Sequence, residues 1–332
     1  MLMVTKKEIA DYLGISRTAV SLALNNSPSS KLSAETKQKI LQAAKELGYR
    51  EHDTSPRICY VLYNREQDDP RYLYHLKEIE LLCSNQNYDM SFMNILPTSQ
   101  SLQKLKRSLD SKKVDGYIVS GDWDEDITKL FRDTSAPYVF FGAPESIQNQ
   151  GYSSISFDHR KLTCHAVRHL ISLGHQQIAL FLGSLEYEIH QEALAGYRDA
   201  LEDANIPVNL SLVQISNEEN GYELATRAHM LGLEYSAAFC SNTIIQFGAL
   251  QYLQSIGVSV PHDVSLIASG SSHLVKISIP QLTCIEISIQ GIQILVSELI
   301  NLIEGSNQLP LQIKYDQFSF FEGGTVAAKN SF

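Results

Sequence analysis

The sequence predicts a small all-α head followed by a two-lobed α/β body of parallel sheets flanked by helices. Three observations support this fold class. Residues 1–50 are basic and hold three short amphipathic segments, and residues 58–332 alternate short β-rich runs with helical stretches. The length of 332 residues suits about two domains. With 44% hydrophobic and 19% charged residues, the chain can bury a large core, which excludes an intrinsically disordered protein.

Several functional classes are excluded by simple patterns. No apolar run approaches the roughly 18 residues of a membrane span, and residues 1–8 lack the apolar region of a secretory signal. The five cysteines are far apart and never form a CxxC pair, which argues against a disulfide framework or a zinc site. We therefore expect a cytoplasmic protein with no membrane association, no metal and no cofactor.

Charge is distributed unevenly along the chain. Residues 1–50 contain eight basic and four acidic side chains, a net charge of +4. Because the whole chain has a net charge of −10, the remainder has a net charge of −14. A basic head on an acidic body is typical of a nucleic-acid-binding module fused to another domain.

The sequence of the head predicts three helices. Thr5 and Glu8 fit a capping box, and Gly14 fits a helix stop. Ser16 is a good N-cap for a second helix, and Ser33 caps a third whose apolar side is predicted to be Ile40, Leu41, Ala44 and Leu47. Residues 25–32 read as a loop. Two helices joined by a tight glycine turn and followed by a third predict a helix-turn-helix.

The second helix carries the predicted chemistry. A helix capped at Ser16 projects Arg17, Thr18 and then Ser21 away from the small core. Lying in a major groove, it can place Arg17 against guanine and Thr18 against a base edge or a thymine methyl. The hydroxyls of Thr5, Ser33 and Thr36, near helix starts, suit phosphate contacts. The plainer interpretation is a three-helix cap with a solvated polar face.

The head resembles the DNA-binding head of the LacI/GalR family of bacterial repressors. The matching residues are Val4-Thr5, Ile9-Ala10, Gly14-Ile15-Ser16, Thr18 to Ser21, Asn25, Leu32 to Thr36, Ala43-Ala44 and Leu47 to Tyr49. The resemblance implies that Arg17 and Thr18 read the operator and that Ser16, Ser21 and Asn25 support them. It also implies that Thr5, Ser33 and Thr36 contact phosphates. Leu22 departs from the family, which often has a base-reading arginine there.

Residues 51–57 form a short predicted linker. The family continues after the head with a hinge helix that inserts a leucine into the minor groove, whereas this segment has two acids, one proline and no leucine. We expect a flexible tether instead of a hinge helix.

The body alternates predicted strands with predicted helices. The predicted strands are 58–63, 90–95, 117–120, 138–142, 153–157, 178–182, 212–215, 237–240, 264–268 and 283–287. The predicted helices are 71–86, 99–111, 159–173, 189–204, 220–231, 243–256 and 288–304. Ten strands would make one large sheet, so we expect two successive lobes with a ligand cleft between them.

The body resembles the same family and its relatives, the type I periplasmic sugar-binding proteins. The likeness rests on segments such as 114–118, 167–179, 196–201 and 260–265. It implies three chain crossings, with lobe one at 58–157 and 286–315 and lobe two at 158–285 and 316–332. The whole span 58–332 would bind the effector and form the dimer.

By the same resemblance, Tyr72, Asp158 and Asn242 line the effector cleft. Three charged groups common in the family are replaced by Ala193, Thr243 and Gly270. Without those groups, the effector is expected to be less polar than a typical sugar, differently bound or absent.

An enzyme is the main rival for an α/β body. The chain has no GxxxxGK[ST] loop, no GxGxxG, no HExxH and no GxSxG, so we predict no enzyme. Cys164, His165 and His169 could suggest a metal site, as could the acids at 122–126, but surface histidines and an acid-rich helix start explain both.

The sequence thus predicts a dimeric transcriptional repressor that binds a pseudo-palindromic DNA operator. Its operator affinity would be controlled by a small molecule, perhaps a sugar derivative, in the cleft between the lobes. Two alternatives stay open: a LacI-like regulator with a protein partner or no effector, and a cytosolic ligand-binding protein.

Overall fold

The computed structural model describes residues 6–24, 32–47, 55–306 and 310–329. It divides into two compact units, Met1–Pro56 and Arg57–Phe332. Within the described part of the chain, no helix is both long enough and apolar enough to cross a membrane.

The head consists of three helices, α1 (Lys6–Leu13), α2 (Arg17–Leu24) and α3 (Ala34–Glu46). Gly14 ends α1 with φ +63°, a conformation that glycine adopts without steric cost. The fully buried Ile9, Val20 and Ile40 come one from each helix and form the centre of the head core.

One core prediction in the head is wrong. Leu41 is 47% exposed, and Ala43 is buried instead. The reason is helical periodicity: Ile40, Ala43 and Ala44 fall on one face of α3, and position 41 lies outside it. Thr5 of the predicted capping box, residues 25–31 of the predicted loop 25–32 and residues 51–54 of the predicted linker lie outside the described residues.

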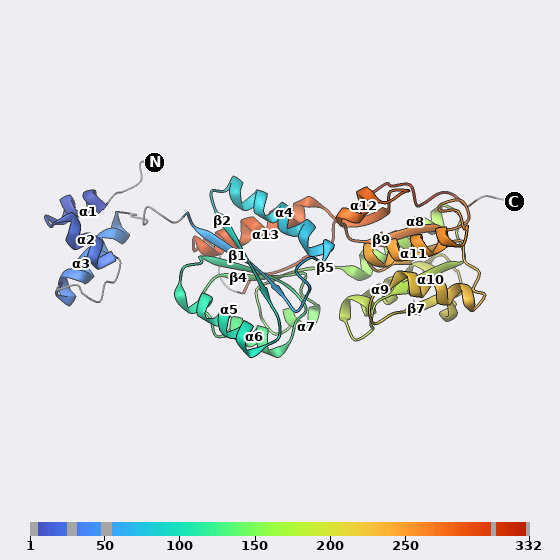
Figure 1. The fold of residues 1–332 in the computed structure, drawn as a ribbon, viewed down its shortest axis with the longest axis horizontal. Helices are drawn as coiled ribbons and strands as arrows, with labels where there is room; N and C mark the ends of the chain where they lie inside the picture. Colours follow the sequence, from blue (N-terminus) through green and yellow to red (C-terminus); the bar gives the residue numbers. More distant parts are fainter. Residues whose placement is uncertain (1–5, 25–31, 48–54, 307–309, 330–332) are drawn as a thin grey trace. The chain divides into compact units, whose positions relative to one another are not determined.

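The body contains two six-stranded sheets, ordered β11-β5-β4-β3-β1-β2 and β12-β10-β9-β8-β6-β7. All pairings are parallel except β10 with β12. We call the parts of the body built on these sheets the first and second lobes (Figure 1). The predicted α/β fold class is confirmed.

The strands of the first lobe are β1 (Arg57–Tyr63), β2 (Asp89–Ile95), β3 (Gly116–Gly121), β4 (Tyr138–Phe141), β5 (Ser154–Phe157) and β11 (Gln312–Tyr315). Those of the second lobe are β6 (Ile178–Leu182), β7 (Val213–Ile215), β8 (Ala237–Cys240), β9 (Ser265–Ser269), β10 (Thr283–Ile287) and β12 (Phe318–Phe321). A 3₁₀ turn (Leu210–Leu212) precedes β7.

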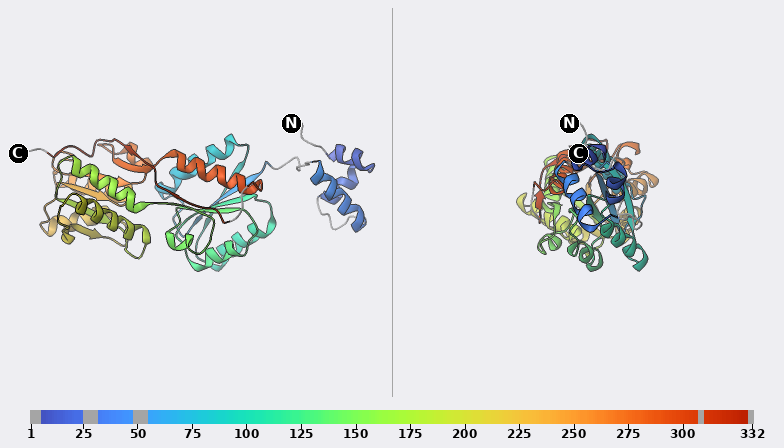
Figure 2. Two further views of the ribbon diagram at one scale, coloured as in Figure 1. Left: turned by 180° about the vertical axis from the view of Figure 1, so that it is seen from behind. Right: turned by 90° about the vertical axis from the view of Figure 1, so that its left-hand side faces the viewer.

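Helices cover both faces of each sheet. The first lobe has α4 (Pro70–Asn85) and α13 (Ile289–Ile303) on one face and α5 (Ser99–Ser111), α6 (Glu125–Arg132) and α7 (Glu145–Gln148) on the other (Figures 1 and 2). The second lobe has α8 (His159–Ser172) and α9 (Glu188–Asp203) on one face. Its other face carries α10 (Gly221–Met230), α11 (Thr243–Ser255) and α12 (His273–Ile277).

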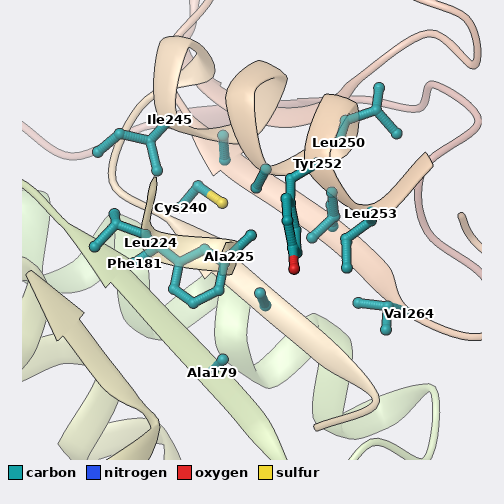
Figure 3. Packing of buried hydrophobic residues seen from close by; sticks show 14 of the residues in the cluster. Ala179, Phe181, Leu224, Ala225, Cys240, Ile245, Leu250, Tyr252, Leu253 and Val264 are labelled. Atoms are coloured by element: carbon teal, nitrogen blue, oxygen red, sulfur yellow. The ribbon is translucent and has the colours of Figure 1, made fainter. Parts of the chain in front are cut away.

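Side-chain alternation along the strands creates these cores. On β1, Ile58, Tyr60 and Leu62 contribute to the core under α4 and α13, while the residues between them contribute to the opposite core. Figure 3 shows the equivalent packing in the second lobe, where Ile245, Leu250 and Leu253 of α11 lie over the sheet near Cys240. Because both faces of each sheet are buried at its centre, inner strands such as β1, β4 and β6 are continuous apolar runs.

The chain passes between the lobes three times, between β5 and α8, between β10 and α13, and between β11 and β12. The three crossings are hydrogen-bonded to one another. Asp158 N donates to Tyr315 O at 3.2 Å, and Ser288 Oγ and Tyr315 Oη share a 2.5 Å hydrogen bond. Lys161 Nζ also pairs with Asp316 Oδ2 at 2.7 Å. The crossings therefore lie together as one connected bundle.

Candidate functional site

The first turn of α2 presents a cation and a hydroxyl to solvent. Ser16 Oγ accepts a hydrogen bond from Ala19 N at 3.1 Å and caps the helix start. Arg17 and Thr18 are exposed, whereas Val20 and Ala23 on the opposite side of the helix are buried. The start of α2 therefore exposes a guanidinium and a hydroxyl on the side of the helix that faces away from the core of the head.

A second group of predicted residues gathers at the start of α3. Ser33 Oγ accepts from Thr36 N at 3.1 Å, and the two hydroxyls share a hydrogen bond of 2.8 Å. Both polar groups lie at a helix N-terminus, where unpaired amides favour anions. Ser21 is half-buried on α2. Thr5 and Asn25 lie outside the described residues.

A cavity of about 270 Å³ lies between the two lobes of the body. Its walls include the carboxyl ends of β3, β4, β5 and β9, the position at which parallel sheets bind ligands. Aromatic side chains form much of the lining: Tyr72, Tyr74, Trp123, Phe141, Phe157 and Tyr187. Such a cavity suits a small molecule with a flat or apolar part.

Arg71 and Glu219 form an ion pair across this cavity. Arg71, near the start of α4 in the first lobe, lies 2.9 Å through Nη1 from Glu219 Oε2 in the second lobe. Arg71 also donates to the Asp69 carboxylate. Burial alone raises the pKa of Glu219, but the hydrogen bond from His190 and the charge of Arg71 outweigh it and lower the pKa to about 2. Glu219 therefore stays ionised at neutral pH.

The backbone holds Glu219 in an uncommon conformation, with φ +53°. Its other carboxylate oxygen lies 3.3 Å from His190 Nε2. His190 in turn packs closely on Gly183, where an added Cβ would be 2.3 Å from the ring nitrogen. Only glycine leaves room for this imidazole.

A second ion pair lies on the first-lobe side of the cavity. Arg65 Nη2 is 2.7 Å from Asp122 Oδ1, and the guanidinium stands over the ring of Tyr187 at 5.9 Å. Arg65 Nε is buried without a hydrogen-bond partner. Unpartnered buried donors are uncommon in proteins, and here one lines a cavity.

Two of the three predicted effector residues line the cavity. Tyr72 and Asn242 do so, and Asn242 Nδ2 is buried without a partner while its Oδ1 caps α11. Asp158 is not in the lining, because its carboxylate accepts from Lys161 N and caps α8. The flanking residues Phe157 and His159 line the cavity instead.

The weaker metal candidates from the sequence have structural explanations. His165 and His169 pack against the rings of Phe318 and Phe320 on β12. Asp124 caps α6 through Ile127 N and accepts a hydrogen bond from the Tyr63 hydroxyl. These side chains contribute to packing and capping.

The sequence analysis did not assign the charged residues of the cavity to the effector site. The family resemblance directed attention to positions 193, 243 and 270, where the usual groups are absent. Ala193 contributes to the core below α9, and Gly270 lines the cavity. Arg65 and Asp122 follow the neighbouring strands β1 and β3, so the rule that sites form at the carboxyl ends of parallel strands could have found them. Nothing local identified Glu219.

The cavity lining also contains a separate group of three carboxylates. Burial raises the pKa of Glu192 on α9 to about 7, with Lys314 opposing the shift and Glu188 adding to it. Glu145, Glu188 and Glu192 offer carboxylate oxygens within 4.8 Å of one another.

Comparison with known protein families gives two matches. Residues 5–51 match the bacterial regulatory proteins of the lacI family, and residues 167–317 match a periplasmic binding protein-like domain. Similar curated sequences include the HTH-type transcriptional repressor PurR of Haemophilus influenzae (strain PittEE), 26% identical over 323 residues, covering 92% of this chain and 94% of the relative. The protein of that name from Pasteurella multocida (strain Pm70) is 27% identical over 299 residues, with coverages of 85% and 86%.

Solved structures show the same architecture. The transcriptional regulator CelR in complex with cellobiose superposes with a TM-score of 0.71 at 22% identity, covering 97% of this chain and 99% of that one. A lac repressor dimer bound to operator and the anti-inducer ONPF gives a TM-score of 0.70 at 22% identity, with coverages of 98% and 100%. At this identity the similarity concerns the fold.

Proposed function

The chain belongs to the lacI family of bacterial regulatory proteins, and from this premise we propose how it reads DNA and how a ligand controls it. It is a DNA-binding transcriptional repressor and not an enzyme. The single observation that carries the DNA-reading proposal is the capped start of α2, which leaves Arg17 and Thr18 exposed.

In this proposal, α2 enters the major groove with its N-terminal turn against the bases. The guanidinium of Arg17 donates to the two acceptors of a guanine, and Thr18 contacts the neighbouring base. Ser16, Ser21 and Asn25 support the reading helix. Thr5, Ser33 and Thr36 bind phosphates and fix the register. Residues 1–50 are the DNA-binding domain, 51–57 the linker and 58–332 the effector-binding and dimerisation domain.

Two copies of the chain act together on the DNA. The head is small, and one helix reads only a few base pairs, so specificity requires two half-sites. A two-fold symmetric dimer imposes the same symmetry on its operator, which is therefore pseudo-palindromic. Binding to chromosomal DNA places the protein in the bacterial cytoplasm.

The interlobe cavity is the proposed effector site. Buried side chains leave hydrogen-bonding atoms without partners on its walls, among them Arg65 Nε and Asn242 Nδ2. A small molecule that supplies acceptors to these donors would recover the free energy lost by burying them unpaired. Tyr72 adds an aromatic face beside Arg71.

Ligand binding at this position can control DNA binding because it acts on both lobes at once. A ligand that fits one lobe angle better than another shifts the population towards that angle. The lobes are joined by the Arg71–Glu219 pair, so a ligand that competes for either charge changes the closure of the cleft.

The test is a selection of bound sequences from a random duplex library with the full chain. The expected result is an enriched inverted repeat with half-sites about one or two helical turns apart, and genes beside its genomic copies would suggest the effector. Binding with no sequence preference at low salt would overturn the proposal.

A further inference from the structure

A glycine after β6 makes room for a histidine beside Asn242. β6 and β8 are parallel neighbours in which Phe181 lies opposite Cys240. Gly183 and Asn242 each follow this pair by two residues, at the carboxyl ends of strands that lie about 4.8 Å apart. The ring of His190 occupies the space beside Gly183, where an added Cβ would be 2.3 Å from Nε2. The imidazole and the Asn242 side chain therefore lie at adjacent strand ends, and both line the interlobe cavity.

The histidine presents an unused acceptor. His190 Nε2 lies 3.3 Å from Glu219 Oε1, and an ionised carboxylate can only accept a hydrogen bond. The single proton of a neutral ring is therefore on Nε2, which leaves a lone pair at Nδ1. His190 is 3% exposed, and its Nδ1 is buried without a partner among the described residues. Such an atom favours a ligand group that donates a hydrogen bond.

The asparagine presents an unused donor. Asn242 Oδ1 accepts from Ile244 N at 3.0 Å and from Ile245 N at 2.9 Å, so capping of α11 fixes which way the amide faces. Asn242 is 6% exposed, and its Nδ2 is buried with no partner in the described part of the chain. The neighbouring Ser241 Oγ is likewise buried and unpartnered. An acceptor and a donor thus stand at neighbouring positions without bonding to each other.

The charge beside these two groups is already matched. Glu219, next to His190, pairs with Arg71 at 2.9 Å. Aromatic rings form much of the remaining lining. Burial lowers the pKa of His75 and of His159 to about 4, so both rings are neutral at pH 7. A ligand group held by His190 would therefore be buried without a free counter-charge next to it, which disfavours an ionised group.

We propose that His190 Nδ1 and Asn242 Nδ2 together select a neutral, flat ligand that carries a group able to donate and accept at once. Its donor bonds Nδ1 and its acceptor bonds Nδ2, while the flat body packs on the aromatic lining. An amide and a hydroxyl both have this chemistry. The inference rests on the proposed function, since it names the ligand class of the same cleft.

The histidine also connects the ligand to the opposite lobe. One oxygen of Glu219 faces His190 Nε2, and the other binds Arg71 of the first lobe. Glu219 and Arg71 are thus positioning residues, because they fix the ring and its proton and act on the ligand through His190. A ligand that bonds Nδ1 extends a hydrogen-bonded chain that ends in the first lobe, which favours the closed cleft.

The experiment observes Trp123, the single tryptophan of the chain, which lines the cavity. The full chain is labelled with 5-fluorotryptophan, and its fluorine resonance is followed at about pH 8, where an ordinary histidine ring is neutral. Benzamide and benzyl alcohol are the amide and hydroxyl probes. Acetophenone and benzyl methyl ether are their analogues that accept but cannot donate, and benzoate and benzylammonium are the charged probes.

At least one of benzamide and benzyl alcohol is expected to bind saturably. It should bind about three- to tenfold more tightly than its non-donating analogue and than either charged probe. Binding of benzamide alone or of benzyl alcohol alone identifies the group. No saturable shift with either probe, or equal or tighter binding of the analogues or the charged probes, would overturn the proposal.

Two variants and one matched control decide the site. His190→Phe keeps a ring without Nδ1 and should bind the donating probe and its analogue equally. Asn242→Ser keeps a capping oxygen without Nδ2 and should weaken both about threefold or more. Asn209→Ser makes the same exchange at a helix cap outside the cavity lining and should titrate as the natural chain does. A preference retained in His190→Phe, or unchanged affinities in Asn242→Ser, contradicts the inference.

Glu219→Gln tests the positioning role and keeps the test decisive if His190→Phe does not fold. Loss of the carboxylate frees the proton of His190, so the preference for the donating probe should fall while the affinity of its analogue stays the same. Equal weakening of both probes would mean that Glu219 only maintains the structure, and it would contradict the positioning role.

Operator binding is measured on the same samples by fluorescence anisotropy. Sequence preference without any response to the probes contradicts this inference and leaves the DNA-binding function standing. Loss of all sequence preference contradicts the proposed function, whatever the fluorine spectra show.

Discussion

Arg71 of the first lobe and Glu219 of the second lie 2.9 Å apart, with side chains only 20% and 17% exposed. Glu219 also accepts from His190, so its carboxylate has partners on both sides of the cavity. Removing one member of such a pair leaves the other charge buried and uncompensated, which is more costly than the loss of an exposed pair.

We therefore expect Glu219→Gln to lower the free energy of unfolding by about 3 kcal/mol. Urea denaturation followed by circular dichroism measures this change. Asp203→Asn, which removes an exposed partner of Arg168 on the outside of the same lobe, is the control and should cost less than about 1 kcal/mol. Equal costs for the two variants would mean that the interlobe pair contributes no more than a surface one.

In the head, Arg17→Ala should cost about 1–3 kcal/mol of DNA-binding free energy at one base position and relax the preference there. The measurement is a set of single-base operator variants titrated by anisotropy. Lys39→Gln, which removes an exposed lysine that pairs with Glu35, is the control. Any loss of DNA affinity in this variant should be the same for all operator sequences. A uniform loss for Arg17→Ala would reassign Arg17 to a phosphate.

Two substitutions at Ser33, the N-cap of α3, distinguish a structural role of its hydroxyl from a DNA-contacting role. Ser33→Ala removes the hydrogen bond to Thr36 N and should destabilise the head by about 1 kcal/mol, seen as faster amide exchange in α3. Ser33→Asp restores a capping oxygen but adds a negative charge. It should keep α3 protected and still weaken DNA binding if this hydroxyl faces a phosphate. Unchanged DNA affinity in Ser33→Asp would show that Ser33 only caps the helix.

Stability should fall in mild acid because of His75. Burial lowers the pKa of this histidine on α4 to about 4, and its ring packs edge-on against Phe141 at 5.4 Å. In the unfolded chain the pKa is about 6.5, so unfolding takes up a proton between these values. The stabilisation from neutral His75 is thus complete above pH 6.5 and is lost as the pH falls towards 4.

His75→Gln should accordingly show a shallower loss of stability between pH 6.5 and 4, by about 2–3 kcal/mol over the range. The exposed His262→Gln is the control. Urea titrations at each pH provide the measurement, and parallel curves for His75→Gln and the natural chain would contradict the assignment.

The sequence predicted the large elements of this protein well, because they are strongly patterned. The ten predicted strands are present within one or two residues, since both faces of each sheet are buried and the strands are apolar. Strands β11 and β12 were missed: they are four residues long, and much of their surface is exposed. The short helices α7 and α12 were missed for the same reason of length, and α6 was anticipated only as an acid-rich helix start.

The site was less predictable than the fold. The exposure of Arg17 and Thr18 follows from the helical period around the buried Val20, so local sequence was sufficient. The cavity charges depend on long-range contacts: Arg71 and Glu219 are 148 positions apart in the chain and meet only because the two lobes face each other. No local pattern encodes such a pair.

The three connections between the lobes restrict how the body can move. They are short, and hydrogen bonds join Asp158, Ser288 and residues 315–317 to one another. A change of backbone torsion in one connection must be matched in the other two, or these bonds break. Independent sliding of one half past the other would break these bonds, so a swing about the connections is the relative motion that they best permit.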